Sequence, residues 1–265
     1  MEDGINLAAD VYLPEGQANE KLPVLVMFER YWRSSVDKKD KDADPKLYGR
    51  GKLFSENGYV IVSVDTRGTG ASFGTRLSEY SPQEVMDAKT VVDWIINQPW
   101  SDGNVGAYGT SYTGTTAELL CATKHPAVKA VIPGWSDFDL YRSPVRPYGL
   151  VASKFIRKWG LYVRLLDRHR SLFIGNKIRP VVKDSLKPAL KDHKDNMKVF
   201  KSVKSGEYRE GNGEFDYVGC SVVSWKKEIE VSNVPMFVLT SWMDAGTAEG
   251  TIQRLEHFSN PQKVL

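Results

Sequence analysis

The sequence predicts an α/β fold with a mostly parallel, doubly wound sheet. Near-continuous apolar runs, typical of strands buried on both faces, alternate with helical segments over the first half of the chain. The same alternation returns near the end, after a long stretch that lacks buried-strand runs. With 265 residues, of which 41% are hydrophobic, the chain is large enough for one α/β domain with an insert.

The first half supplies most of the predicted elements. Ser81 is a good N-cap for one helix, Pro82 suits its first turn, and Glu84 completes the pattern of a capping box. In chain order we expect a strand over 6–13, a strand over 22–31, a helix over 47–57, a strand over 59–65, a helix over 81–97, a strand over 105–111, a helix over 113–124 and a strand over 128–133.

The middle of the chain differs in composition from the rest. Residues 154–204 contain fifteen Lys/Arg against four Asp/Glu, and Phe155, Leu161 and Leu165 recur at helical spacing. This stretch predicts a mostly helical insert. The β/α pattern then resumes with a strand over 234–240, a helix over 247–258 and the start of one more strand at the end.

These patterns divide the chain into three parts. We expect a first part of the α/β core over 1–135, a helical cap insert over 136–232, and a second, incomplete part of the core over 233–265. The missing continuation of the last strand indicates that the C-terminal part of the fold is truncated.

Composition restricts the partners and the compartment. A net charge of +3 is too small to indicate nucleic-acid binding, and the basic stretch has few of the aromatic residues that stack on bases. No apolar run approaches the roughly 18 residues of a membrane span, and the N-terminus lacks the features of a signal peptide. We therefore expect a cytoplasmic protein without membrane or nucleic-acid partners, and a homo-oligomer is compatible with the sequence. Scattered histidines and two cysteines predict neither a metal nor a cofactor.

The stretch GTSYTG, residues 109–114, predicts a nucleophile elbow at Ser111. An apolar strand precedes it and a helix follows, which is the context that presents a catalytic serine. The common pattern is G-x-S-x-G, however, and here the second glycine, Gly114, stands one residue late. We expect Gly114 to lie one turn into the helix, close to the preceding strand. The alternative is an ordinary serine in a glycine-rich turn.

Asp244 is the candidate for the acid that orients a catalytic base. It follows a predicted strand directly, so it lies at the same edge of the sheet as Ser111, where ligands bind in open α/β folds. Serine before acid is also the chain order of α/β-hydrolases. The alternative for Asp244 is a capping role at the helix that follows.

The base is harder to locate. Of the four histidines, His257 alone follows Asp244, but it precedes the last predicted strand, whereas this fold requires the histidine after that strand. We therefore expect the catalytic histidine beyond Leu265, with His257 as a weaker candidate inside the chain.

Several segments together resemble a known family. The segments 3–14, 65–74 and 100–114, with Trp-Met-Asp-Ala-Gly at 242–246, are similar to the cocaine esterase and X-Pro dipeptidyl-peptidase (S15-like) group of serine hydrolases. The elbow of this group reads G-x-S-Y-x-G, which accounts for the late glycine. The resemblance implies an α/β-hydrolase fold with a helical cap, Ser111 as nucleophile and Asp244 as triad acid. It also implies an oxyanion hole made by the backbone N–H of Tyr112 and the hydroxyl of Tyr31.

The expected function is that of a serine hydrolase. The resemblance implies cleavage of a small-molecule carboxylic ester or amide through an acyl-enzyme, as in the CocE/NonD-like acyl esterases. An X-Pro dipeptidyl-peptidase-type aminopeptidase is the alternative within the group. A third reading is a non-catalytic fragment, because the family's histidine loop and C-terminal jelly-roll domain have no match in this sequence.

Overall fold

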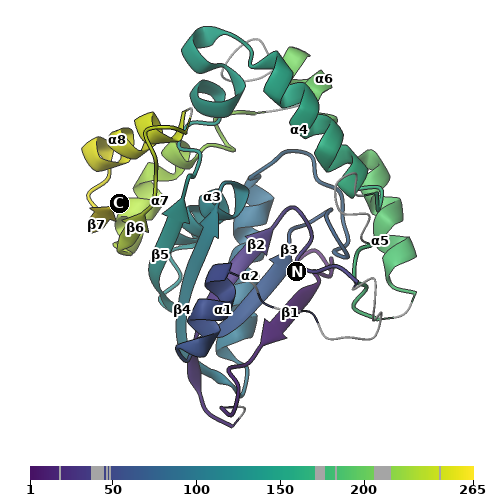
Figure 1. The fold of residues 1–265 in the computed structure, drawn as a ribbon, viewed down its shortest axis with the longest axis vertical. Coiled ribbons are helices and arrows are strands. Elements are labelled where there is room, and N and C mark those ends of the chain that lie inside the picture. Colours follow the sequence, from purple (N-terminus) through teal and green to yellow (C-terminus); the bar gives the residue numbers. More distant parts are fainter. Residues whose placement is uncertain are drawn as a thin grey trace.

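The computed structural model describes residues 1–265 except 18, 37–44, 46, 48, 171–176, 183, 206–215 and 245. The described strands form one seven-stranded sheet in the order β1-β3-β2-β4-β5-β6-β7 (Figure 1). Only β1 pairs antiparallel, with β3, so the predicted α/β class with a mostly parallel sheet is confirmed. The strands are β1 (Ala9–Tyr12), β2 (Leu22–Glu29), β3 (Val60–Asp65), β4 (Ser101–Thr110), β5 (Val128–Gly134), β6 (Met236–Val238) and β7 (Gln262–Val264).

Helices pack on both faces of the sheet. Along β2, Val24 and Val26 pack in the main core with α2, α3 and α7, whereas Leu25 points to the opposite face and packs in the cluster that includes Phe54 of α1. This alternation is what a strand buried on both faces requires. The helices beside the sheet are α1 (Gly49–Glu56), α2 (Pro82–Ile96), α3 (Tyr112–Leu119), α7 (Lys226–Ser232) and α8 (Thr247–His257), of which α7 is the last part of the predicted insert.

The predicted N-terminus of α2 is confirmed, but the predicted capping box is wrong. Ser81 is the N-cap, its side chain accepts the backbone N–H of Glu84 at 3.2 Å, and Pro82 begins the helix. The side chain of Glu84 does not turn back to complete a capping box. It is buried and accepts a hydrogen bond from the phenol of Tyr112 at 2.8 Å, because the Tyr112 side chain, at the start of α3, reaches this end of α2.

The predicted insert contains the helices that lie over the carboxyl edge of the sheet (Figure 1). These are α4 (Ser153–Leu166), α5 (Leu186–Asp192) and α6 (Val199–Ser205). We use "the cap" for residues 136–232, a division of the chain that remains a prediction. Three of its stretches, 171–176, 183 and 206–215, lie outside the described residues. Short helical turns complete the described structure at Leu120–Thr123, Tyr141–Val145, Pro147–Gly149, His193–Asp195 and Val222–Trp225.

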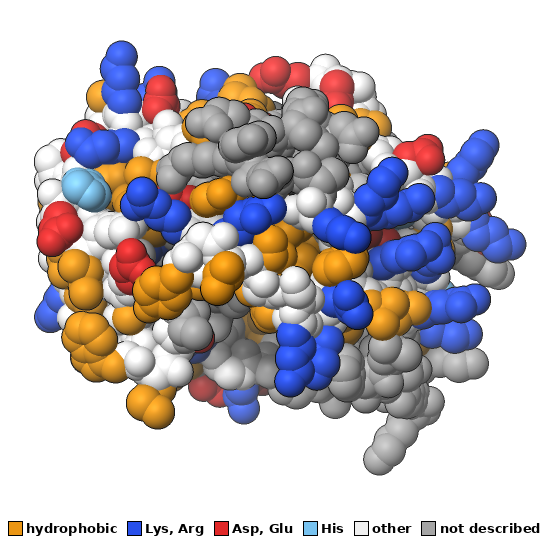
Figure 2. All heavy atoms as spheres, turned by 90° about the horizontal axis from the view of Figure 1, so that it is seen from above, with side chains coloured by type: hydrophobic (Ala, Val, Ile, Leu, Met, Phe, Trp, Pro, Cys, Tyr) orange, Lys and Arg blue, Asp and Glu red, His pale blue; other side chains and the backbone are white. Residues whose placement is uncertain are grey.

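Positive charge is concentrated in the cap. Residues 154–204 hold fifteen of the 36 Lys and Arg and four of the 33 Asp and Glu, so this stretch carries +11 and the remainder of the chain −8. Figure 2 looks down on this side of the molecule and shows many Lys and Arg side chains with hydrophobic ones between them. No helix in the described part of the chain has the length and apolar character needed to cross a membrane.

A buried ion network joins the cap to the core. The side chain of Arg30, which follows β2, is fully buried and pairs with Glu79 at 3.2 Å and with Asp167 at 2.9 Å. Asp167 directly follows α4 and also binds Arg76 at 3.1 Å. Breaking a buried, hydrogen-bonded ion pair is costly, so this network fixes the C-terminal end of α4 on the core.

Two of the segments that carry the family resemblance are tied together by ion pairs. Arg67, in the loop after β3, binds Asp3 at 2.7 Å and Asp87 of α2 at 2.7 Å. In the same loop, a Cβ at Gly70 would overlap the carboxyl group of Asp65. These motif residues therefore build the scaffold beside the sheet and lie outside the pockets that Ser111 lines.

Candidate active site

Ser111 occupies a strained turn between β4 and α3. Its backbone has φ 60° and ψ −121°, a region that residues other than glycine rarely adopt. The turn is held from both sides: Ser111 N–H donates to the carbonyl of Gly134 at 2.8 Å, and the Thr113 hydroxyl accepts the N–H of Thr110 at 2.8 Å. Strand, strained serine and helix are the three parts of a nucleophile elbow, and the serine is exposed.

Both glycines of GTSYTG are required by close backbone contacts. A Cβ at Gly109 would overlap the backbone of Thr113, and a Cβ at Gly114 would overlap the carbonyl oxygen of Gly134. Gly114 therefore faces β5, the neighbouring strand, and not the preceding strand β4 as the sequence suggested. The reason is that α3 packs on β5 as well as on β4, so the late glycine sets how closely the helix can approach the sheet.

Tyr112 is the first residue of α3. The first N–H groups of a helix have no intrahelical acceptor and lie at its positive end, so this N–H is available to an anion. The side chain of Tyr112 fixes the position of the turn through two contacts. Its ring stacks on Tyr80 with centroids 4.3 Å apart, and its phenol donates to Glu84.

The buried Glu84 makes stability depend on pH. Burial raises its pKa to about 8, with the charge of Glu79 adding to the effect. The native state thus binds this proton more tightly than the unfolded chain, and its stabilising contribution is lost as pH rises from about 4.5 through about 8. We expect Glu84→Gln, which keeps an acceptor for Tyr112, to leave the thermal midpoint nearly unchanged at pH 4, below the ordinary pKa of 4.5, and to raise it above that of the wild type at pH 9. An equal shift at both pH values would contradict this.

Tyr31 lies just beyond the end of β2 and lines the same pocket as Ser111. Its hydroxyl oxygen accepts the indole N–H of Trp159 at 2.9 Å. Burial raises the pKa of Tyr31, so the phenol keeps its proton at neutral pH and remains a hydrogen-bond donor. Tyr31 thus meets the chemical requirement that the resemblance placed on it.

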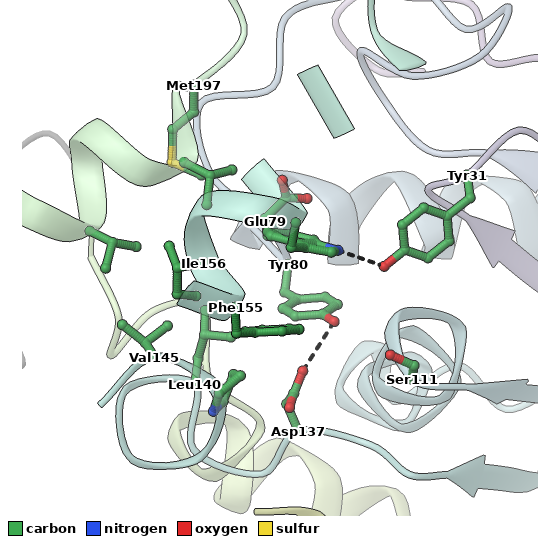
Figure 3. Close-up of a pocket in the computed structure, with 14 residues that line it drawn as sticks. Tyr31, Glu79, Tyr80, Ser111, Asp137, Leu140, Val145, Phe155, Ile156 and Met197 are labelled. Carbon is green, nitrogen blue, oxygen red and sulfur yellow. Dashed lines mark hydrogen bonds between the residues drawn. The ribbon is translucent and has the colours of Figure 1, made fainter. Parts of the chain in front are cut away.

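An apolar pocket opens beside the serine (Figure 3). Its polar lining is made by Ser111, Tyr31, Glu79, Tyr80 and Asp137, whose labelled side chains lie on one side of the cavity in Figure 3. The rest of the lining is hydrophobic and comes from the cap, with Leu140, Pro144, Val145, Phe155, Ile156, Trp159, Met197, Val199 and Val203. We call this cavity the apolar pocket.

Asp137 is a pocket residue that the sequence reasoning missed. It follows β5, its carboxylate lies 3.4 Å from the hydroxyl of Tyr80, and burial raises its pKa to about 6. The sequence pattern that identified Asp244 also applies to Asp137. Both acids come just after a buried strand and so reach the same edge of the sheet.

Asp244 follows β6 and shares a second, larger groove with Ser111, lined also by Trp135, Trp242 and Met243. Its carboxylate accepts the hydroxyl of Thr247, the first residue of α8, at 2.8 Å. The N-cap position itself belongs to Gly246. The structure thus brings the predicted nucleophile and the predicted acid to one groove, and the catalytic role of Asp244 stays a prediction.

None of the four histidines lines either cavity next to Ser111 in the described part of the chain. His257 is exposed at the last position of α8, so a helix of roughly 15 Å separates it from the end that adjoins Asp244. The other three bind protein atoms elsewhere: His125 with Asp93, His169 with the N–H of Ile178, and His193 with the carbonyl of Ser72.

The sequence has recognisable relatives. The family model described as X-Pro dipeptidyl-peptidase (S15 family) matches residues 3–265. A putative serine esterase from Mycobacterium bovis is 32% identical over 311 residues, covering 100% of this chain and 49% of the relative. A cocaine esterase from a Rhodococcus species is 34% identical over 166 residues, covering 62% of this chain and 27% of the relative. The chain spans about half the length of the first of these curated relatives.

Solved structures share the fold. A CocE/NonD family hydrolase from Staphylococcus aureus superposes with a TM-score of 0.75 at 21% identity, covering 100% of this chain and 44% of that one. An α-amino acid ester hydrolase superposes with a TM-score of 0.62 at 18% identity, covering 100% of this chain and 46% of that one. These likenesses confirm the predicted α/β-hydrolase fold.

Proposed function

Because the chain belongs to the X-Pro dipeptidyl-peptidase (S15) family, we propose that it forms the nucleophile-bearing part of a serine hydrolase that cleaves carboxylic esters through an acyl-enzyme. One observation carries the proposal. Ser111 sits in a strained elbow at the mouth of an apolar pocket, with a helix N-terminus behind it and the Tyr31 phenol in the same lining.

The reaction follows from the groups around Ser111. The serine oxygen attacks the ester carbonyl, and the resulting oxyanion accepts hydrogen bonds from the Tyr112 N–H and the Tyr31 hydroxyl. A histidine, which we place beyond Leu265, takes the serine proton and passes it to the leaving alcohol, while Asp244 orients that histidine. Water then attacks the acyl-enzyme with the same histidine as base, which releases the carboxylic acid and restores the serine.

The pocket lining favours a neutral, apolar acyl group. Its cap side is formed by aliphatic and aromatic side chains, which gain from excluding water around a hydrocarbon chain. Of the two acids in the lining, Asp137 is buried, which disfavours its charged form, and Glu79 is already paired with Arg30 at 3.2 Å and Arg76 at 3.1 Å. A substrate ammonium would have to compete with both guanidinium groups for it. We therefore favour an esterase over an X-Pro dipeptidyl-peptidase.

Two esters with one leaving group test this preference. The p-nitrophenyl esters of 3-methylbutanoic acid and of valine differ by a single ammonium group on the acyl part. We expect the full-length protein to cleave the neutral ester with a kcat/KM at least roughly tenfold higher, after the uncatalysed rate is subtracted. Preference for the valine ester, together with cleavage of Ala-Pro-p-nitroanilide at a comparable rate, would favour the peptidase instead.

A further inference from the structure

We propose that Trp159, on cap helix α4, is a positioning residue that aims the Tyr31 hydroxyl at the oxyanion, so that the cap completes the oxyanion hole. The proposal rests on the function proposed above. It assigns to the cap a part in the chemical step, besides its part in lining the pocket.

The hydrogen bond between the two side chains has only one possible direction. An indole nitrogen can donate but cannot accept, so the Tyr31 oxygen is the acceptor in the 2.9 Å contact with Trp159 (Figure 3). The phenol proton must therefore point away from the indole. In the described part of the chain no side chain accepts that proton through a hydrogen bond. Since Tyr31 and Ser111 line the same pocket, the proton is free for a substrate oxygen bound there.

The phenol ring is held on its other sides as well. Tyr162 stacks on it with centroids 5.9 Å apart and planes at 26°, and Tyr112 meets it edge to face at 6.2 Å. At the backbone, the N–H of Tyr31 donates to the carboxylate of Glu29 at 2.7 Å. Trp159 and Tyr162 are three residues apart and so lie on one face of α4. One helix face thus fixes both the plane of the ring and the direction of the hydroxyl.

The position of α4 is itself fixed next to the same segment. Asp167, which follows the helix, binds Arg30 through two contacts of 2.9 Å and 3.3 Å, and Arg30 immediately precedes Tyr31. Arg30 and Tyr31, two consecutive residues just after β2, therefore both bind α4 or the residue that follows it. If the helix shifted, the phenol would lose its orientation, because its oxygen and its ring are bound to side chains of that helix.

A double-mutant cycle on the full-length protein distinguishes a Trp159 that positions the Tyr31 hydroxyl from a Trp159 that only lines the pocket. With p-nitrophenyl 3-methylbutanoate as substrate, we expect Tyr31→Phe to lower kcat roughly 100-fold, as loss of an oxyanion donor does. Trp159→Phe keeps an aromatic ring and removes the N–H. We expect it to lower kcat roughly tenfold with little change in KM. In the Tyr31→Phe background the same substitution should change kcat no further, because the group it acts through is gone.

Trp225→Phe is the matched control. Its indole N–H donates to the backbone carbonyl of Gly219 at 3.2 Å, so the substitution removes the same kind of donor away from both cavities, and kcat should be unchanged. A kcat loss from Trp159→Phe that is equal in both backgrounds, or an effect on KM alone, would overturn the proposal. If Tyr31→Phe leaves kcat unchanged while Ser111→Ala abolishes it, the positioning role fails together with the oxyanion role of Tyr31, and the nucleophile assignment stands.

Discussion

Replacement of Ser111 with alanine is expected to abolish ester hydrolysis by the full-length protein. The substitution removes the oxygen that forms the acyl-enzyme in the proposed mechanism, and it leaves the Tyr112 N–H and the apolar pocket in place. In serine hydrolases the loss of the nucleophile costs kcat roughly ten-thousand-fold or more, with substrate binding largely kept. The measurement is the initial rate with p-nitrophenyl 3-methylbutanoate, after subtraction of the rate in buffer.

Ser143→Ala provides the control for this experiment. Ser143 lines the same groove as Ser111 and Asp244, but its hydroxyl donates to the carbonyl of Gly246 at 3.0 Å and is not placed in an elbow. We expect its variant to keep kcat within a fewfold of the wild type. If Ser111→Ala retained a comparable rate while remaining folded, the acyl-enzyme route at this residue would be ruled out.

The largest expected effect on stability comes from Glu118→Ala. Glu118 of α3 binds Arg254 of α8 through contacts of 2.6 Å and 2.7 Å, and neither side chain has any exposed surface. Removing the carboxylate leaves a buried guanidinium without its partner, a change that costs about 3–5 kcal/mol of the free energy of unfolding. Denaturant titration should show this loss as a lower midpoint.

The pair also joins the helix that follows the proposed nucleophile to the helix that follows Asp244. The matching surface substitution is Glu56→Ala, which removes an exposed pair with Lys52 at 3.6 Å. Its effect on unfolding should be about 0.5 kcal/mol or less. Equal losses for the two variants would show that the buried pair contributes no more than a surface pair does.

Local patterns account for the parts of the structure that the sequence predicted well. Val60–Asp65 is a run of buried residues, as its apolar sequence indicates, and Ser81 caps α2 because N-cap chemistry depends only on neighbouring residues. GTSYTG could be identified as an elbow for the same reason, since the motif contains both the strained serine and the glycines that allow close packing.

Asp137 could have been found from its place after a strand, but two other errors and omissions involve partners that are distant in sequence. Glu84 has the spacing of a capping box, but Tyr112, 28 residues away, takes its side chain. Trp159 looks like an ordinary apolar position in a cap helix, and its bond to Tyr31 spans 128 residues. Neither contact follows from periodicity or propensity, because each depends on how α3 and α4 pack on the sheet.

Labelling with a fluorophosphonate probe, with the modified peptide located by mass spectrometry, tests the central claim most directly. It reports the covalent nucleophile itself, whatever the natural substrate. The proposed mechanism predicts that the full-length protein is labelled on Ser111 and that Ser111→Ala is not labelled. Since the proposed mechanism takes its base histidine from outside residues 1–265, it also predicts that a chain of these residues alone, if folded, is labelled far more slowly. Labelling of another residue, or no labelling of the folded full-length protein, would contradict the assignment of Ser111 as the nucleophile.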